Sequence, residues 1–230
     1  MRVLGIETSS RRGSVALVED GRLVAHTSYD EPNLHAERVL PQIERLIEQA
    51  SWKRSELERI AVGVGPGSFT GLRIGIALAQ GLALGLRAEL VGVGSLVAMA
   101  AAVPESQPGA RICLLDARRG EVFLAAYDRG GNELIAPCAI ARDAVVSALR
   151  GQPMRELTAT APEPVVVGEI GSELQGLERL LRSTETDLPH AIWTARLGAG
   201  SEPAGAALEP VYVRDAGASL PNLQKSPFVK

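Results

Sequence analysis

Residues 3–18 and 112–127 of this chain follow the same pattern. Each stretch begins with a short apolar run, passes through an acidic residue into a polar loop containing Arg-Arg-Gly, and ends in a second apolar run. Apolar runs separated by turn residues are typical of strands joined by hairpins. The recurrence favours an internal duplication, and chance repetition of a short strand-turn-strand unit is the alternative.

The residues after each hairpin alternate between strand and helix patterns. Apolar spacings of three and four indicate helices, and short apolar runs between turn residues indicate strands. In the first half we expect strands over Arg22–Ala25, Ile60–Val64 and Leu90–Val93, and helices over Asn33–Ala50, Leu72–Leu86 and Ser95–Val103, with Asn33 and Ser95 as N-caps. In the second half we expect strands over Glu133–Ile135 and Val165–Val167, and helices over Arg142–Leu149 and Glu173–Leu181.

A turn-rich segment, Pro104–Gly109, marks the expected boundary between two lobes, residues 1–104 and 105–230. The tail from Glu209 onward contains proline and is expected to be a loop that lies on the body, where it can return to the first lobe. Two halves that open with a hairpin and continue into βα units resemble actin, hexokinase and acetate kinase. The predicted fold class is therefore α/β, a duplicated actin-like (ASKHA) ribonuclease-H-like fold of two lobes with mixed sheets.

In that architecture the two acid-led hairpins hold nucleotide phosphates from opposite sides. The resemblance therefore predicts that Glu7 and Asp116 face one cleft between the lobes, and it makes Glu7, Thr8, Ser9 and Asp116 the candidates for a nucleotide or phosphate site. Magnesium bound to a nucleotide uses carboxylates in this way. Two features argue against such a site: Glu7 is one methylene longer than Asp, and its loop carries arginines rather than small residues.

The glycine-rich segment Gly63–Gly75 predicts a turn that opens a helix. Backbone N–H groups at a helix start, with Arg73 nearby, would suit an anion. The segment lacks the Lys-Ser/Thr of a nucleoside-triphosphate P-loop and the spacing of the dinucleotide fingerprint. Tight packing of strand against helix is the alternative, and the residues alone favour it.

The helix that follows contains Gly71, Gly75, Gly81 and Gly85. A glycine inside a helix costs about 1 kcal/mol relative to alanine, so four of them require a compensating benefit. We expect that benefit to be the close approach of another helix, either within the domain or in another subunit.

Composition limits the chemistry that the chain can perform. Its 24 basic and 27 acidic residues give a net charge of -3, so any contact with a polyanion such as tRNA would have to be local. The two cysteines, Cys113 and Cys138, are expected to be buried and reduced. No histidine among His26, His35 and His190 has a second ligand at metal spacing, and His35 is expected at the surface or in a cap. No serine lies in a nucleophile elbow. Catalytic and metal sites are therefore not predicted.

Neither export nor a membrane anchor is predicted. The opening MRVLGIE enters a strand pattern directly, unlike a signal peptide. The longest charge-free helical stretch, Ile74–Leu86, is too short to span a bilayer. We therefore expect a cytoplasmic protein.

Taken together, the motifs resemble the bacterial TsaB (YeaZ) family. The Gly65–Gly75 block is highly specific, and the matching blocks span nearly the whole chain. They are Ile6-Glu-Thr, Ser14-Val-Ala, Gly65–Gly75 with Ala79–Ala83, Asp116–Val122 and Glu209–Arg214. The resemblance implies a non-catalytic subunit of the complex that makes threonylcarbamoyladenosine on tRNA, at the adenosine beside the anticodon.

The resemblance also implies partners. These are a catalytic paralogue, TsaD, and an ATPase, TsaE, with tRNA reached only through the complex and a homodimer as a further option. No cofactor is implied, except for ATP or ADP at the complex interface. TsaD holds a metal through two histidines four residues apart, where this chain has His35 and Val39. The interface residues implied on the two helices of the first lobe are His35, Val39, Ile43, Leu72, Gly75, Ala79 and Leu82, so Gly75→Leu or Ala79→Arg should abolish the heterodimer.

This chain departs from the family pattern at Glu7, where many relatives have Asp. Two other functions stay open. One is an ATP-dependent phosphotransferase of the sugar-kinase type, although such kinases are usually longer and no base for a sugar hydroxyl is evident. The other is a glycoprotease-like hydrolase, which no zinc pair or nucleophile supports.

Overall fold

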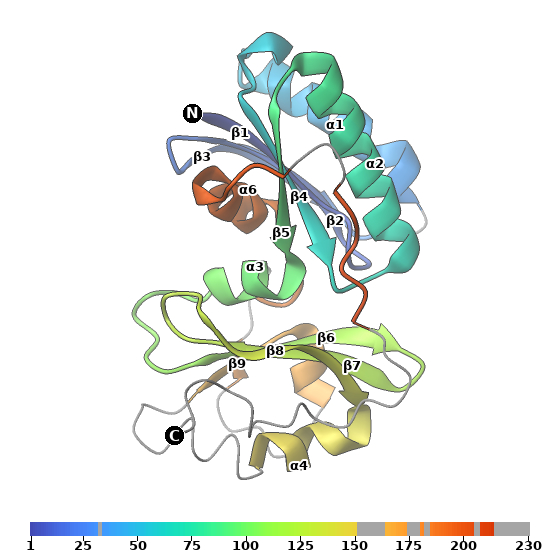
Figure 1. Cartoon of the computed structure of the whole chain (residues 1–230), viewed down its shortest axis with the longest axis vertical. Coiled ribbons are helices and arrows are strands. Elements are labelled where there is room, and N and C mark those ends of the chain that lie inside the picture. Colours follow the sequence, from blue (N-terminus) through green and yellow to red (C-terminus); the bar gives the residue numbers. More distant parts are fainter. Residues whose placement is uncertain (32–33, 151–163, 174–179, 182–184, 205–207, 214–230) are drawn as a thin grey trace.

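The computed structural model describes residues 1–31, 34–150, 164–173, 180–181, 185–204 and 208–213. Two lobes, one above the other in Figure 1, each contain a five-stranded sheet. The first sheet has the order β3-β2-β1-β4-β5 and the second has the order β10-β9-β6-β7-β8. The first comprises β1 (Arg2–Glu7), β2 (Gly13–Glu19), β3 (Arg22–Tyr29), β4 (Arg59–Gly65) and β5 (Glu89–Gly94). The second comprises β6 (Arg111–Arg118), β7 (Glu121–Tyr127), β8 (Glu133–Ala141), β9 (Val165–Val167) and β10 (Leu180–Leu181).

The two sheets share one topology. In the first, β2 pairs antiparallel with β1 and β3, and β4 pairs parallel with β1 and β5. In the second, β7 pairs antiparallel with β6 and β8, and β9 pairs parallel with β6 and β10. The second sheet read from β8 to β10 therefore repeats the first read from β3 to β5. The predicted duplication is confirmed at the level of strand order.

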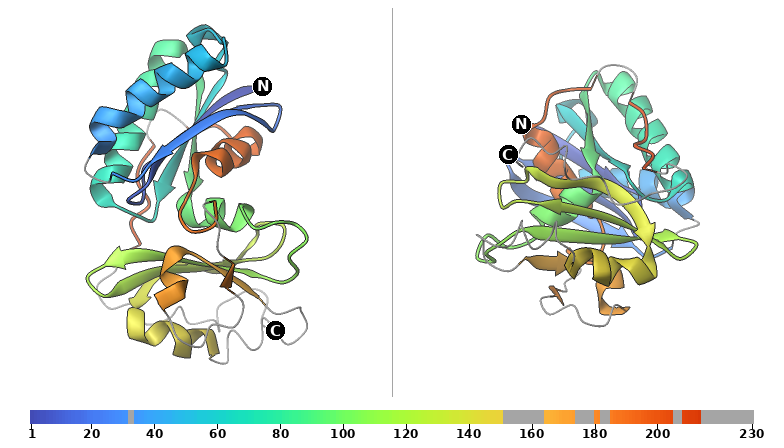
Figure 2. Two further views of the ribbon diagram at one scale, coloured as in Figure 1. Left: turned by 180° about the vertical axis from the view of Figure 1, so that it is seen from behind. Right: turned by 60° about the horizontal axis from the view of Figure 1, so that its bottom comes forward.

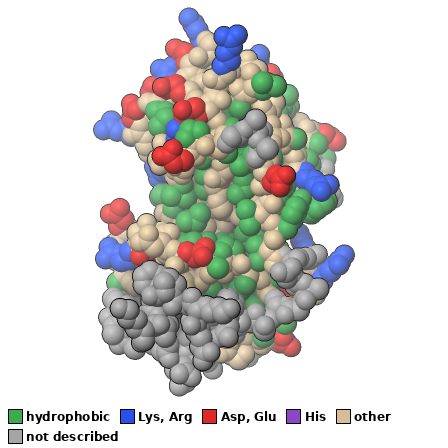
Figure 3. All heavy atoms as spheres, viewed as in Figure 1, with side chains coloured by type: hydrophobic (Ala, Val, Ile, Leu, Met, Phe, Trp, Pro, Cys, Tyr) green, Lys and Arg blue, Asp and Glu red, His purple; other side chains and the backbone are tan. Residues whose placement is uncertain are grey.

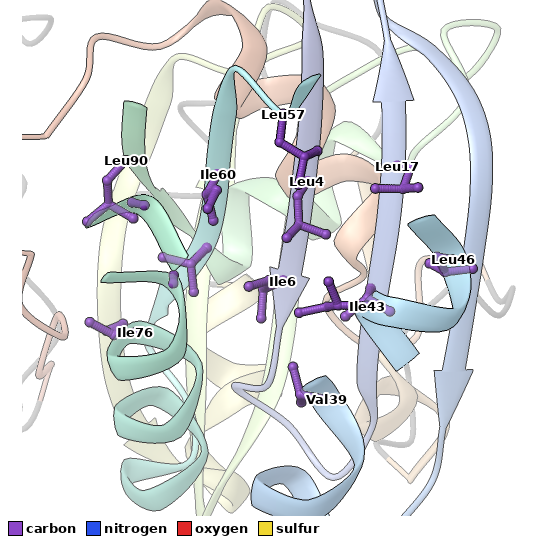
Figure 4. Close-up of a cluster of buried hydrophobic side chains, with 14 of the residues drawn as sticks. Leu4, Ile6, Leu17, Val39, Ile43, Leu46, Leu57, Ile60, Ile76 and Leu90 are labelled. Atoms are coloured by element: carbon purple, nitrogen blue, oxygen red, sulfur yellow. The ribbon is translucent and has the colours of Figure 1, made fainter. Parts of the chain in front are cut away.

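Helices α1 (His35–Gln49) and α2 (Phe69–Leu86) cover one face of the first sheet (Figure 1). Val39, Ile43 and Leu46 lie on one side of α1, because their spacing follows the helical repeat, and all three are buried. Figure 4 shows these side chains pointing toward Leu4 and Leu17 of the sheet. Each such side chain contributes about 1.5–3 kcal/mol by leaving water, so this layer fixes α1 and α2 on the sheet.

The last helix of each lobe packs on the sheet of the other lobe. Helix α3 (Ser95–Ala101) follows β5 but contacts β6 and β7 of the second sheet. Helix α6 (Ala191–Gly200) follows β10 but lies on the first sheet, against β1, β2 and β4. Figure 2 shows both helices between the sheets, where they contact each other. On the outer side of the second sheet lies α4 (Val145–Arg150).

Arg59 of β4 holds the C-terminal end of α6. Its guanidinium is buried and donates to the carbonyl oxygens of Gly198, Ala199 and Ser201 at 2.8, 3.0 and 2.8 Å. The last carbonyls of a helix carry partial negative charge and lack partners within the helix, so a cation there is stabilising. This contact joins the two halves of the sequence within one lobe.

The chain then runs back over the first lobe. The Ala204 amide donates to the Leu90 carbonyl at 2.7 Å, and the Val211 amide donates to the Val64 carbonyl at 2.8 Å. Leu208 occupies the space beside Gly92, where a Cβ atom would collide with it. We call residues 208–213 the C-terminal strap. Its path along α2 agrees with a tail that returns to the first lobe.

Several local expectations need correction. Helix α1 begins after Leu34, which makes no side-chain cap, and Asn33 lies outside the described residues. Helix α2 begins at Phe69 rather than Leu72 because Ser68 caps it, and Gly94 rather than Ser95 is the N-cap of α3. The helix expected over Glu173–Leu181 is wrong at its described ends, which are a 3-10 turn (Glu169–Glu173) and β10; residues 174–179 lie outside the described part.

Helix α2 is also longer than its charge-free portion suggested. Its 18 residues have a mean hydropathy of 1.4, so by length and composition the helix could cross a membrane. The argument that the charge-free stretch Ile74–Leu86 is too short to span a bilayer was therefore wrong, because the whole helix is longer. Core helices of folded domains pass the same test. One third of this stretch is buried in the lobe, on the side that packs on β4.

Candidate functional site

A cleft of about 370 Å³ lies between the lobes. Its walls come from the β1–β2 loop, the start of α2, the β6–β7 hairpin, Glu169 and the C-terminal strap. The lining residues are Ser9, Ser10, Arg11, Pro66, Gly67, Ser68, Phe69, Thr70, Leu115, Asp116, Ala117, Arg118, Arg119, Phe123, Glu169, Leu188, Val211, Tyr212 and Val213. Both duplicated hairpins therefore reach one cleft, as predicted. Hydrophobic side chains cover much of the middle of the face shown in Figure 3, whereas charged ones gather on the first lobe above it.

Glu7 does not line this cleft. Its side chain is fully buried, where the Ser9 amide donates to Oε1 at 2.9 Å and the Thr194 hydroxyl of α6 donates to Oε2 at 3.2 Å. Burial raises the pKa of this carboxyl group, and these hydrogen bonds oppose the rise. The expectation that Glu7 faces the cleft is wrong, because α6 returns to the first sheet and covers it.

Thr8 and Ser9 explain the glycines at the start of α2. Thr8 Oγ1 donates to the Gly71 carbonyl at 2.8 Å, and a Cβ atom at Gly71 or Gly75 would collide with Thr8. The Ser68 amide donates to the Ser9 carbonyl at 2.6 Å, and the Gly71 amide donates to Ser68 Oγ at 3.2 Å. The packing interpretation of the glycine-rich segment is therefore confirmed.

The remaining two glycines of α2 have a different environment. A Cβ atom at Gly81 or Gly85 would meet nothing within 4 Å. The expectation that a second helix packs closely against the glycines is therefore wrong for Gly71 and Gly75, which contact Thr8 just after β1 instead. Gly81 and Gly85 lie on the open face of α2.

Asp116 lies in the cleft and is partly exposed. It accepts hydrogen bonds from the Arg118 amide at 2.9 Å and from Arg142 Nη2 at 3.3 Å. The hairpin tip beside it places Arg118 and Arg119 at φ values of 65° and 54°. Left-handed backbone costs a non-glycine residue about 1–2 kcal/mol, so the tip holds two exposed arginines in a strained conformation.

Arg11 bridges the mouth of the cleft. Its Nη1 is 2.7 Å from Asp30 Oδ1 in the first lobe, and its Nη2 is 2.7 Å from Glu169 Oε2 in the second. Because the Arg11 side chain is 40% exposed, each pair contributes little stability, although together they link the two lobes.

An aromatic pair at the cleft rim was missed by the sequence analysis. Phe69 and Tyr212 are each 53% exposed, and their ring centroids are 5.5 Å apart with 30° between the planes. Arg73 lies over Phe69, 3.9 Å from the ring centroid, and its Nε donates to the Tyr212 hydroxyl at 3.3 Å. Only the return of the C-terminal strap brings these residues together, so no local signal could have predicted the pair.

Most of the residues expected at a partner interface are inside the lobe. His35, Val39, Ile43, Leu72 and Ala79 are at most 2% exposed, Gly75 is buried against Thr8, and Leu82 is half-buried. The six buried residues cannot contact a partner directly, so the assignment was wrong for them because it chose the inward faces of the helices. Leu82, which is half-buried, stays a prediction. The exposed residues of the same two helices include Leu40, Ala77, Gly81, Leu84 and Gly85, and Leu84 is 84% exposed.

His35 is held inside the first lobe. Its Nε2 donates to the Ser10 carbonyl at 3.0 Å, and its Nδ1 accepts from the Tyr29 hydroxyl at 3.1 Å. Burial lowers the pKa of the imidazole. The expectation of a surface or capping histidine is therefore wrong. Within the described ranges, no three His, Cys, Asp or Glu side chains are placed to hold a metal ion.

Comparisons with known proteins agree on one group. The family described as tRNA N6-adenosine threonylcarbamoyltransferase, TsaD, matches residues 31–168. The tRNA threonylcarbamoyladenosine biosynthesis protein TsaB of Escherichia coli is 34% identical over 224 residues, which cover 94% of this chain and 95% of that protein.

Solved structures give the same result. A crystal structure of an uncharacterized Pseudomonas aeruginosa protein with similarity to peptidase YEAZ has a TM-score of 0.77 at 30% identity, covering 93% of this chain and 99% of that one. YeaZ from Pseudomonas aeruginosa has a TM-score of 0.72 at 28% identity, with coverage of 92% and 99%.

Proposed function

The chain belongs to the TsaB family of tRNA threonylcarbamoyladenosine biosynthesis proteins, and from this premise we propose that it is the non-catalytic docking subunit of the modifying complex. Its relatives support a part in this biosynthesis. The docking role, with a TsaD-like paralogue and a TsaE-like ATPase as partners, is the finer proposal.

The observation that carries the proposal is the outer face of α2. Leu84 projects 84% exposed between Gly81 and Gly85, which have no side chain and open space above them. We call Ala77, Gly81, Leu84 and Gly85 the α2 docking face. Glycines let two helix axes approach closely, and a leucine is a suitable knob for the groove of a facing helix. A paralogue with the same fold offers such a helix.

The interior of the first lobe supports the absence of catalysis. At the positions that resemble the metal-binding pair of TsaD, His35 is hydrogen-bonded on both ring nitrogens, and Val39 is part of the hydrophobic core. Glu7 is covered by α6 rather than open to a substrate. We therefore do not favour phosphotransfer or hydrolysis by this chain, and we propose that any ATP or ADP binds where the subunits meet. tRNA is then reached through the complex, in the cytoplasm.

The test is co-purification with a TsaD-like partner. Gly75→Leu and Ala79→Arg are unsuitable variants because both positions are buried and the fold itself would suffer. Leu84→Lys changes only the α2 docking face, and a cation near the C-terminus of a helix is favourable. Leu23→Lys is the matched control, since Leu23 is 37% exposed on the edge strand β3, where lysine is well tolerated.

We expect Leu84→Lys to abolish co-elution while leaving the melting temperature of the isolated chain unchanged, and Leu23→Lys to preserve co-elution. Homodimers should dissociate with the same variant if they use the same face. Co-elution of Leu84→Lys at the wild-type level would refute the docking role. A modification assay with and without this chain, using otherwise complete components, tests whether it is needed at all.

A further inference from the structure

The strongest unassigned feature of the molecule is the aromatic rim of the cleft. Phe69 opens α2 and Tyr212 belongs to the C-terminal strap, yet their half-exposed rings lie side by side. The chain has only eight aromatic residues of the Phe, Trp and Tyr types, so placing two of them together at a solvent-exposed rim leaves a large part of its aromatic surface in water. Arg73 stacks on Phe69 and bonds Tyr212, which holds the pair in one geometry.

The opposite wall of the cleft is cationic. Arg118 and Arg119 are exposed at the tip of the β6–β7 hairpin, where their backbone is strained. The two carboxylates of the cleft are already engaged, Asp116 with Arg118 and Arg142, and Glu169 with Arg11. Arg119 makes no ion pair within the described ranges. The cleft thus has excess positive charge in a chain whose net charge is -3.

The first-lobe wall of the cleft contains a buried polar group. Ser9 lines the cleft, and its Oγ atom is buried without a hydrogen-bond partner in the described part of the chain. A buried hydroxyl of this kind costs free energy unless a ligand or water satisfies it. Aromatic surface and guanidinium groups therefore line a space of about 370 Å³, in the size range of small-ligand pockets, with the unsatisfied Ser9 hydroxyl buried in its wall.

We propose that this cleft rim binds an unstacked nucleotide of single-stranded RNA. The base stacks on the Phe69–Tyr212 pair, and Arg118 and Arg119 contact the adjoining phosphates. Stacking on aromatic side chains beside a basic wall is how proteins hold single strands. The inference rests on the proposed function, because a role in tRNA modification supplies the RNA.

Free nucleoside triphosphate fits the cleft less well. Two amides at the helix start, those of Ser68 and Gly71, already donate to Ser9 and Ser68, which leaves fewer donors for a phosphate. Glu7, the first of the two hairpin carboxylates, is buried behind α6. The aromatic pair is also at the open rim rather than enclosed, which suits a strand that continues beyond the site.

The experiment is fluorescence anisotropy with a labelled single-stranded RNA of about ten nucleotides, the length that such sites cover. It uses this chain alone and in complex with a TsaD-like partner. Phe69→Leu and Tyr212→Leu remove the rings but keep apolar volume, and Tyr212→Phe is the conservative variant. Arg118→Gln combined with Arg119→Gln removes the cationic wall, and Arg22→Gln combined with Arg45→Gln removes two exposed charges outside the cleft.

Each ring-to-leucine variant should bind the RNA about 5-fold to 100-fold more weakly, and Tyr212→Phe should bind within about 3-fold of wild type. The Arg118/Arg119 variant should lower the slope of log affinity against log salt by about 1.4, because each phosphate contact contributes about 0.7 on single strands. The Arg22/Arg45 variant should leave the slope unchanged.

Three results would each overturn the proposal. Wild-type affinity of both ring variants, or equal losses in the Arg22/Arg45 control, would show only diffuse electrostatic binding. AMP or ATP binding as tightly as the RNA would show a mononucleotide pocket instead. Co-elution of the ring variants with the partner is measured in parallel, so failure of the RNA site is distinguishable from failure of the docking role, which Leu84→Lys tests separately.

Discussion

The start of α2 offers a sharp test of the packing described above, because two of its glycines are in contact with a loop and two are not. Gly71→Ala places a Cβ atom against the Thr8 carbonyl, a backbone atom that cannot move independently. Overpacking of this kind costs about 1–3 kcal/mol. Weakening the Thr8–Gly71 hydrogen bond costs about 1 kcal/mol more, and the helix propensity of alanine returns about 1 kcal/mol. The net expectation is a loss of about 1–3 kcal/mol.

Gly81→Ala is the matched control on the same helix. Its Cβ atom meets nothing, so only the propensity gain of about 0.5–1 kcal/mol remains. Urea unfolding of the two variants and wild type should therefore move the midpoint down for Gly71→Ala and up for Gly81→Ala. Equal or higher stability of Gly71→Ala would refute the reasoning.

Gly75 adds a double-mutant cycle. There the colliding atom is Thr8 Oγ1, which belongs to a side chain that can be removed. Thr8→Ala should relieve the destabilisation by Gly75→Ala but not that by Gly71→Ala, where the obstacle is the Thr8 carbonyl. A coupling energy near zero for the Thr8–Gly75 pair would show that the contact does not limit the space at this position.

Three further predictions follow from buried polar groups. Burial raises the pKa of Glu7, so ionisation of this carboxyl group destabilises the fold at pH values above its unfolded pKa of about 4.5. In urea titrations Glu7→Gln should therefore be more stable than wild type at pH 7 and should lose this advantage near pH 4. Lower stability of Glu7→Gln at pH 7 would contradict this reasoning. Burial lowers the pKa of His190 to about 4, and its Nδ1 accepts from the Ile192 amide at the start of α6. The neutral imidazole of His190 therefore contributes its full stabilisation above pH 6.5, and the free energy of unfolding falls by roughly 3 kcal/mol toward pH 4 as the ring is protonated. His190→Asn should flatten this dependence of stability on pH. An unchanged profile would exclude His190 as its origin. Arg59→Leu should cost roughly 3 kcal/mol and increase hydrogen exchange in α6, because three carbonyls lose a charged donor; unchanged exchange would show that Arg59 does not hold the helix.

The sequence alone determined the duplication and most element types, although the helix expected over Glu173–Leu181 was wrong at its described ends. Apolar spacing in α1 identified Val39, Ile43 and Leu46 as one face, and the turn residues between apolar runs identified both hairpins, because these patterns are local. The Gly65–Gly75 block was specific enough to suggest the family that the comparisons support. The packing interpretation of that block was also correct.

Only the tertiary structure decided which faces are covered. Periodicity groups residues into faces, but what covers a face depends on segments that are distant in the sequence. His35 and Gly75 were therefore assigned to a partner interface although they are buried inside the lobe, and the exposed Leu84 was overlooked. The return of α6 buried Glu7, and the return of the C-terminal strap brought Tyr212 beside Phe69. Both contacts join segments that lie far apart in the sequence, so no local pattern encodes them.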